Sequence, residues 1–209
     1  MPGEEGTWIV SGGKGTNGGT VASVIQYNGT HWDAYNNLGP GISDHCQVND
    51  GKNVLVIGGT WGLQPPSSLK NVFKLSGGVW FQYHLLKTPR MKHMCVVLND
   101  IVYVMGGIDD TRYPYSVEYL SSVEMLLPGS DGWTPGPAMP DAVYQGQAVV
   151  YNNSIFVVGR NNSGMFAEPH MFRLDEGAYQ WVTVEDFFSF GYRYVFPPPL
   201  LYEHQLYCK

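Results

Sequence analysis

The stretch NDIVYVMGGIDD, residues 99–110, decides the fold. Its centre, Ile101 to Met105, is apolar at every position, and the run ends at the pair Gly106 and Gly107. A short apolar run rich in β-branched and aromatic residues is typical of a strand buried on both faces, or of part of a buried helix. Two glycines directly after it indicate backbone in a conformation that other residues avoid, or backbone packed against backbone.

Closely similar stretches occur three more times along the chain. WIVSGG ends at residue 13, VLVIGG at residue 59 and IFVVGR at residue 160. The first glycines of the four copies are 46, 48 and 53 residues apart (58−12, 106−58, 159−106). These structural markers are Gly12, Gly13, Gly58, Gly59, Gly106, Gly107 and Gly159, with Arg160 where an eighth glycine would stand.

Four tryptophans recur with the same period. Trp32, Trp80, Trp133 and Trp181 are 48, 53 and 48 residues apart (80−32, 133−80, 181−133). Because two independent markers share one period, the sequence predicts a repeat architecture. A tryptophan that recurs once per repeat is predicted to pack between neighbouring repeats rather than to serve as a stacking platform for a ligand.

Each repeat has the same internal order. A variable loop follows the glycines, and then come an alternating strand (for example SSVEML), a tight turn, the tryptophan and a further strand such as MCVVL. A short Asn/Asp/Gly turn, which supplies positive φ, leads back to the glycine-tipped strand. This order predicts four antiparallel strands per ~50 residues, the arrangement of a propeller blade. We expect units at about 1–40, 41–88, 89–140 and 141–190, with the start of another at 191–209.

The composition agrees with an all-β protein and excludes some functions. Charged and aromatic residues each make up 14% of the chain, and there are 26 Gly and 14 Pro. Few charges with many aromatic and turn-forming residues favour short strands and tight turns. The net charge of −6, with only 12 scattered basic residues, argues against nucleic-acid binding. No apolar run approaches the ~20 residues of a membrane span, and the acidic start does not resemble a signal peptide.

The repeats resemble kelch repeats. The likeness is strongest in SSVEMLLPGSDGWTPGPAMP (121–140) followed by GQAVVYNNSIFVVG (146–159). The resemblance implies a β-propeller, most often of six blades, which would need roughly 300 residues. With 209 residues, we expect a fragment or an unusually small ring, and we favour the fragment because an open propeller leaves strand edges unpaired.

Several other features are interpreted as structural. Cys46 and Cys95 are expected to be buried small hydrophobic residues, and three cysteines with no CxxC spacing suggest neither a disulfide framework nor zinc. His45 and His93 precede them at matching repeat positions. GKGTNG (13–18) fits a dinucleotide-binding pattern, but the following TVASVIQY has a β-pattern where that site requires a helix. We therefore expect no cofactor, no metal and no catalytic residues.

Three Asn-X-Ser/Thr sequences begin at Asn28, Asn152 and Asn161. About one or two such matches arise by chance in this composition, and asparagine is favoured in these turns anyway. They leave an extracellular location open. No compartment is assigned from the sequence, although we lean toward the cytoplasm.

The loops after the glycines are the predicted functional region. They span 14–19, 60–68, 108–116 and 161–168, and no two are alike, although the strands beneath them are. Loops on a rigid scaffold often carry binding, and Arg, Tyr and Trp dominate interface energetics. The candidate partner-binding residues are Trp61, Arg112, Tyr113, Tyr115, Arg160, Asn161, Met165 and Phe166. GRNNS (159–163) resembles a segment of kelch adaptors in which the arginine contacts an acidic peptide. An arginine that simply caps the strand is an equal alternative.

These features favour a protein-interaction module that binds a protein or peptide through its loop face. The kelch resemblance implies a further role as the substrate-recognition part of a cullin-type ubiquitin ligase adaptor, acting through a BTB domain that these residues do not contain. The alternatives are an extracellular adhesion or glycan-binding protein and a kelch-fold enzyme, either a sugar oxidase or an epimerase. No catalytic motif or constellation supports the enzyme.

Overall fold

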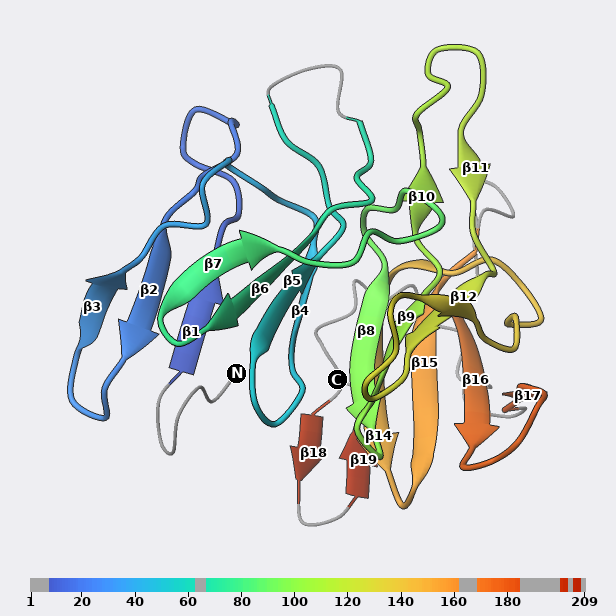
Figure 1. Ribbon diagram of the computed structural model, residues 1–209. Helices are drawn as coiled ribbons and strands as arrows, with labels where there is room; N and C mark the ends of the chain where they lie inside the picture. Colours follow the sequence, from blue (N-terminus) through green and yellow to red (C-terminus); the bar gives the residue numbers. More distant parts are fainter. Residues whose placement is uncertain (1–7, 63–66, 162–168, 185–199, 203–204, 208–209) are drawn as a thin grey trace.

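The computed structural model describes residues 8–62, 67–161, 169–184, 200–202 and 205–207, and these residues form strands and loops without any helix. Four antiparallel sheets, here called blades 1 to 4, follow one another along the chain and stand side by side (Figure 1). The prediction of an all-β fold built from antiparallel blades is therefore confirmed. No helix in the described part is long and apolar enough to cross a membrane.

The strand bounds follow the predicted order within each repeat. Blade 1 has three strands, β1 (Trp8–Ser11), β2 (Val24–Tyr27) and β3 (Trp32–Tyr35). Blade 2 has four, β4 (Cys46–Asn49), β5 (Val54–Ile57), β6 (Val72–Ser76) and β7 (Val79–Gln82). Blade 3 consists of β8 (Met94–Leu98), β9 (Ile101–Met105), β12 (Val123–Leu126) and β13 (Thr134–Pro135). Blade 4 consists of β14 (Tyr144–Tyr151), β15 (Ser154–Arg160), β16 (Pro169–Asp175) and β17 (Val182–Thr183).

Two hairpins lie outside the blades. One pairs β10 (Ile108–Asp109) with β11 (Glu118–Tyr119), and the other pairs β18 (Leu200–Tyr202) with β19 (Gln205–Tyr207). The β10–β11 hairpin projects from the upper end of the molecule in Figure 1. It occupies the loop that directly follows the glycine pair of blade 3.

The glycine pairs end their strands for two physical reasons. Gly106 has a φ of 63°, and a Cβ atom there would lie 2.2 Å from the carbonyl oxygen of Val143. Gly107 donates its N–H to that same oxygen at 2.8 Å. Positive φ and close backbone contact both require glycine. In blade 4, Gly159 lacks the positive φ and Arg160 continues β15, so this strand runs to seven residues rather than five.

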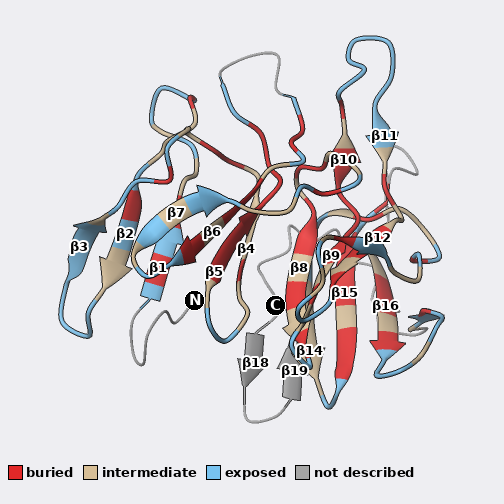
Figure 2. Cartoon of the chain, viewed as in Figure 1, coloured by how far each residue is buried: buried red, intermediate tan, exposed pale blue. Residues whose placement is uncertain are grey.

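Buried side chains fill the three spaces between consecutive blades, as the red segments of β5, β9 and β15 show in Figure 2. One cluster joins Ile9 and Val24 of blade 1 to Val54 and Val56 of blade 2. The corresponding clusters between blades 2 and 3 and between blades 3 and 4 use the same strand positions. Apolar contact between sheets is thus repeated from blade to blade.

The tryptophans of blades 2 to 4 tie each blade to the one before it. Their indole N–H groups donate to main-chain carbonyls of the preceding repeat at 2.8, 3.0 and 2.8 Å, in the pairs Trp80–Asn36, Trp133–His84 and Trp181–Pro137. Trp32 of blade 1 has no preceding blade in the described part of the chain, and half of its surface is exposed. Trp32 therefore lies in a different environment from the other three tryptophans, although all four recur with one period in the sequence.

One face of blade 1 is apolar and exposed. Trp8, Val10 and Ile25 lie on it, and in blades 2 to 4 the residues that match Trp8 and Val10 in the strand register are buried between sheets. Val54 and Val56, for example, are almost inaccessible to solvent. The exposed face therefore has the character of an interface between blades.

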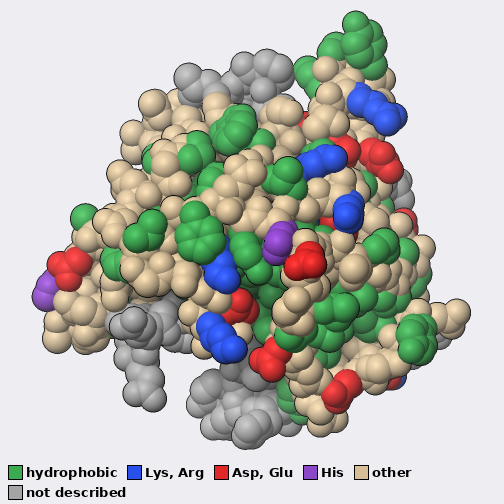
Figure 3. All heavy atoms as spheres, in the orientation of Figure 1, with side chains coloured by type: hydrophobic (Ala, Val, Ile, Leu, Met, Phe, Trp, Pro, Cys, Tyr) green, Lys and Arg blue, Asp and Glu red, His purple; other side chains and the backbone are tan. Residues whose placement is uncertain are grey.

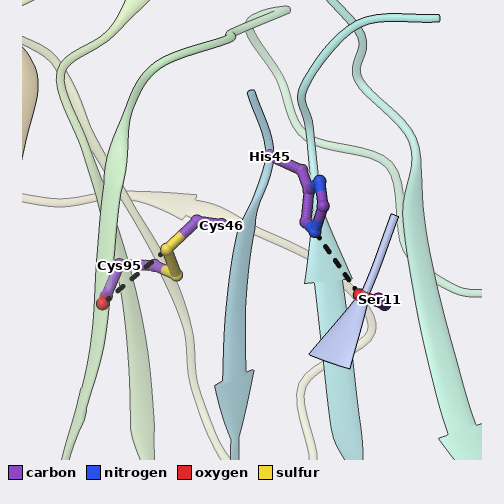
Figure 4. The surroundings of a disulfide bond; sticks show 4 residues. All are labelled: Ser11, His45, Cys46 and Cys95. Carbon is purple, nitrogen blue, oxygen red and sulfur yellow. Dashed lines mark hydrogen bonds between the residues drawn. A yellow bond between two sulfur atoms is a disulfide. The ribbon is translucent and has the colours of Figure 1, made fainter. Parts of the chain in front are cut away.

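A disulfide joins Cys46 of β4 to Cys95 of β8, so the expectation of two separate buried thiols is wrong (Figure 4). The Cα atoms are 6.0 Å apart, which suits a disulfide. Cys46 directly follows His45, whereas Cys95 comes two residues after His93. Because a shift of one residue moves a strand side chain to the other face of its sheet, Cys46 faces blade 3 and Cys95 faces blade 2.

A buried ion pair crosses the same interface. The side chain of Arg90, fully buried in the linker before β8, donates from Nη2 to Glu124 Oε1 of β12 at 2.9 Å. The Glu124 carboxylate also accepts the main-chain N–H groups of Lys87 and Thr88, at 2.7 and 3.0 Å. Burial lowers the pKa of the Arg90 guanidinium, and the charge of Glu124 opposes that shift. Both charges are therefore compensated inside the protein.

Candidate functional site: the loop face

The segments that follow the glycine pairs gather at one end of the blades, at the top of Figure 1. We call this end the loop face, and we define it by the described residues of the four loops, 14–19, 60–62 with 67–68, 108–117, and 160–161. The hairpin turns between strands, such as 28–31 and 152–153, lie at the opposite end, which we call the turn face. The predicted candidate residues that the structure describes belong to these segments, namely Trp61, Arg112, Tyr113, Tyr115, Arg160 and Asn161.

The base of the β10–β11 hairpin is fixed to the neighbouring loop by two reciprocal hydrogen bonds. Ser68 donates its main-chain N–H to Asp110 Oδ1 at 2.6 Å, and the N–H of Asp110 donates to Ser68 Oγ at 3.1 Å. Both residues are buried. Ile108 also exchanges two main-chain hydrogen bonds with Met91 of the linker before β8. The hairpin therefore rises from a rigid base.

The tip of this hairpin presents large side chains to solvent. Tyr115 is 94% exposed and Tyr113 is 59% exposed, and Arg112 and Val117 are exposed beside them. Figure 3 shows hydrophobic side chains gathered at this projection, with a basic side chain below them. Internal hydrogen bonds hold the turn, because the N–H of Tyr113 donates to the Asp110 carbonyl and that of Tyr115 to the Arg112 carbonyl, each at 2.8 Å. An ordered turn therefore presents the exposed aromatic side chains of the hairpin tip to solvent.

Trp61 is the large side chain of the second loop, and it is 42% exposed. The neighbouring Gly62 donates its N–H to Thr20 Oγ1 of the first repeat at 3.2 Å, which connects the two loops. In the first loop, Lys14 forms an ion pair with Asp44 at 3.1 Å. The loop face therefore carries mixed charge around its aromatic residues.

The two described candidates of the fourth loop, Arg160 and Asn161, lie in different environments. Arg160 is exposed at the end of β15, where it is paired with Tyr144 and Pro169 in the sheet. Asn161 is buried, and its amide donates to Asp141 Oδ2 at 2.9 Å and contacts His170 Nε2 at 2.7 Å. It holds the loop in place rather than facing solvent. Met165 and Phe166 lie outside the described residues.

Three residues that the sequence interpretation missed line up beneath these loops. Asp44, Lys92 and Gln145 have positive φ values of 53°, 55° and 50°. The N–H of Lys92 donates to the Asp44 carbonyl at 2.8 Å, and the N–H of Gln145 donates to the Lys92 carbonyl at 2.9 Å. A chain of main-chain hydrogen bonds thus links blades 2, 3 and 4 where their first strands begin. The spacing of 48 and 53 residues (92−44, 145−92) is the signal that could have found them.

The two repeat histidines lie just below this chain of hydrogen bonds. Burial lowers the pKa of His93 well below its ordinary value, and the nearby charges of Arg90 and His45 lower it further. Burial also lowers the pKa of His45, against the opposing charge of Asp44. His45 contacts Ser11 Oγ at 3.4 Å (Figure 4). Both shifts favour the uncharged form of the imidazole rings, which suits their buried place in the scaffold.

Two observations bear on whether the described residues form a metal or catalytic site. No group of three or more His, Cys, Asp or Glu side chains within them is arranged to hold a metal ion. A hollow of about 340 Å³ lies between blades 1 and 2, lined by residues that include Ile9, Tyr35, Asn49 and Lys52. Its lining includes residues 51–53 and 77–78 of two hairpin turns and no carboxylate, so it lacks a paired acid and base.

Comparison with known proteins agrees with the repeat pattern and the blades. A family model described as Kelch motif matches residues 89–140, which contain β8, β9, β12 and β13. Residues 89–140 therefore contain a kelch repeat. It is 29% identical to beta-scruin of Limulus polyphemus over 146 residues, which cover 66% of this chain and 15% of that protein.

The names of two other relatives include the words "Kelch repeat". The identity is 32% with Kelch repeat and BTB domain-containing protein 3 of Homo sapiens, over 38% of this chain and 13% of that protein. It is 34% with Kelch repeat protein C2 of Vaccinia virus, over 53% of this chain and 20% of that protein. The matching part of this chain thus corresponds to a fifth or less of the length of each of these three relatives.

A solved structure shares the fold. The protein described as "Structure of YjhT" superimposes with a TM-score of 0.64 and 15% sequence identity, covering 82% of this chain and 54% of that one. At this identity the match concerns the fold alone. Blades 1 to 4 therefore have the arrangement of consecutive blades in a kelch-type propeller.

Proposed function

We propose that this kelch-repeat chain is a protein-interaction module whose loop face binds a protein or peptide, with the β10–β11 hairpin as the main contact. The observation that carries the proposal is the exposure of Tyr113 and Tyr115 on a turn held by its own hydrogen bonds and by the Ser68–Asp110 pair. Tyrosine and arginine are enriched among residues that dominate binding energy. A preorganised loop also loses little conformational entropy when it binds.

Two narrower functions compete within this proposal. Similarity to a Kelch repeat and BTB domain-containing protein supports substrate recognition in a cullin-type ubiquitin ligase, which would act inside the cell. The Cys46–Cys95 disulfide supports the second candidate, an extracellular adhesion protein, because disulfides persist mainly in oxidising compartments. Both candidates use the loop face in the same way, and they differ in where the chain works.

Replacing both Tyr113 and Tyr115 with Ala is expected to weaken binding of the natural partner by about 10- to 100-fold, because the two side chains supply the contact area at the hairpin tip. The midpoint of thermal unfolding should change little, because exposed side chains contribute little to stability. Titration calorimetry with the purified partner measures the first quantity and scanning calorimetry the second.

Tyr179→Ala is the matched control. Tyr179 is 92% exposed, nearly as much as Tyr115, but it lies in the turn between β16 and β17 on the turn face. We expect this variant to bind with unchanged affinity. Equal losses in both variants would contradict a specific role for the loop face. A large fall in the melting temperature of the double variant would show that the hairpin tyrosines stabilise the scaffold.

A further inference from the structure

Two of the three Asn-X-Ser/Thr sequences have their asparagine in an exposed hairpin turn on the turn face. Asn28, Gly29 and Thr30 form the turn between β2 and β3, and all three are exposed. Asn152 is exposed at the start of the two-residue turn between β14 and β15, whereas Ser154 of the same sequence is buried at the start of β15 and its hydroxyl donates to Asp175 Oδ1 at 2.8 Å. Asn161 differs from both, because it is buried and its amide is engaged by Asp141. The structure thus separates accessible from inaccessible asparagines.

We propose that Asn28 and Asn152 are acceptors of N-linked oligosaccharide. In this reaction the amide Nδ2 of asparagine bonds to C1 of the sugar of a lipid-linked oligosaccharide. The bond from C1 to the lipid pyrophosphate breaks, and Nδ2 loses one proton. The acceptor signal is Asn-X-Ser/Thr with X other than proline, in a surface turn of a secreted protein.

The geometry around Asn28 tolerates a glycan. Its Oδ1 accepts the main-chain N–H of Thr30 at 3.0 Å and the Thr30 hydroxyl at 2.8 Å. Its Nδ2 donates to Asp33 Oδ2 at 2.9 Å and contacts His31 Nε2 at 3.2 Å. A glycosylated amide keeps its oxygen and one N–H, so the bonds to Thr30 survive together with one of the two Nδ2 contacts, and the sugar replaces the other. The sugar would leave from the exposed edge of the turn.

The disulfide is an independent observation that favours the same compartment. Joining Cys46 to Cys95 removes two electrons and two protons from a pair of thiols, which an external disulfide oxidant accepts by exchange. Such oxidants act in the secretory pathway and outside the cell, where disulfides persist and where N-glycans are attached. A covalent link between blades and accessible acceptor turns are therefore consistent features of one environment.

The proposed sugars would leave the binding region free. Asn28 and Asn152 lie at the turn face, at the opposite end of the blades from the β10–β11 hairpin (Figure 1). Glycans there would shield the turns while the loop face stays accessible. The inference does not depend on the proposed function, because occupied acceptors would be found even if the loop face bound nothing.

The test is peptide mapping of the native protein purified from its source tissue. Free thiols are alkylated without reduction, and a peptide N-glycosidase in heavy-oxygen water then converts each glycosylated asparagine to labelled aspartate. We expect the label at Asn28 and Asn152 and none at Asn161. Recovery of unmodified peptides containing Asn28 and Asn152 before enzyme treatment overturns the proposal, whether or not Cys46 and Cys95 are found linked.

Two variants of Thr30 separate modification from folding in the native cell type. Thr30→Ala destroys the acceptor signal without changing Asn28, and Thr30→Ser keeps it. The full-length Thr30→Ala protein should lose the mass of one glycan, and the Thr30→Ser protein should retain it. An unchanged mass in Thr30→Ala would show that Asn28 carries no sugar.

Discussion

Replacing Cys46 with Ser and Cys95 with Ala is expected to lower the free energy of unfolding of the oxidised protein by about 4 kcal/mol. The disulfide spans a sequence separation of 49 residues, and closing a loop of that length restricts the unfolded chain by about this amount. Alanine suits the second position, because Ala148 of blade 4 is paired in the sheet at the register position that Cys95 occupies in blade 3. The native sheets should therefore tolerate the substitution.

Denaturant unfolding with and without reductant measures this effect. The wild-type protein should lose stability on reduction, and the double variant should be insensitive to reductant. A Cys208→Ser background in both proteins removes any alternative pairing with the third cysteine. If reduction leaves the wild-type stability unchanged, the covalent link between blades 2 and 3 has no energetic role.

Replacing Glu124 with Gln is expected to cost about 3–5 kcal/mol, the range measured when one partner of a buried ion pair is removed. The guanidinium of Arg90 would stay charged in a fully buried site. Its remaining acceptors are the carbonyls of Gly106 and Ser122, at 2.8 and 3.2 Å, and the Ser122 hydroxyl at 3.2 Å, and these neutral groups cannot compensate that charge. The same denaturant titration provides the measurement.

The double variant Arg90→Met with Glu124→Gln tests whether the two side chains act as a pair. It removes the uncompensated charge, and the glutamine oxygen can still accept one N–H from Lys87 or Thr88. We expect the double variant to be more stable than Glu124→Gln alone. A double variant whose cost equals the sum of the two single costs would show that the side chains are not coupled.

The repeated elements could be predicted from sequence because each has one physical cause in every repeat. Gly12, Gly58 and Gly106 all adopt positive φ and lie close to a carbonyl oxygen of the following linker. Such a site accepts only glycine, so it leaves a periodic mark in the sequence. The paired strands and the tryptophan of each blade follow the same period.

Other contacts could not be predicted because they occur once and across an interface. The Cys46–Cys95 link depends on a shift of one residue relative to the histidine period, which reverses the face of the side chain. Glu124 stands where the sister strands have the apolar Phe73 and Phe172. The period therefore predicts an apolar contact there, and the structure shows an ion pair instead.

The candidate site was predicted at the level of loops more than of single residues. The sequence identified the segments after the glycines, because these vary while the strands repeat. It could not distinguish the exposed Tyr115 from the buried Asn161, since both are loop residues of types that often contact partners. Exposure depends on contacts such as those of Asp141 and His170 with Asn161, which come from other segments of the chain.

Photo-crosslinking from single positions tests the role of the loop face most directly. A benzoylphenylalanine placed at Tyr115 in the native cell type should form a crosslink to one dominant protein, and the same residue placed at Tyr179 should not. The two positions are almost equally exposed and lie at opposite ends of the blades. A difference in crosslinking between them therefore reflects which face they occupy and not how exposed they are. Crosslinking to the same protein from Tyr179 only, or equally from both positions, would contradict binding through the loop face.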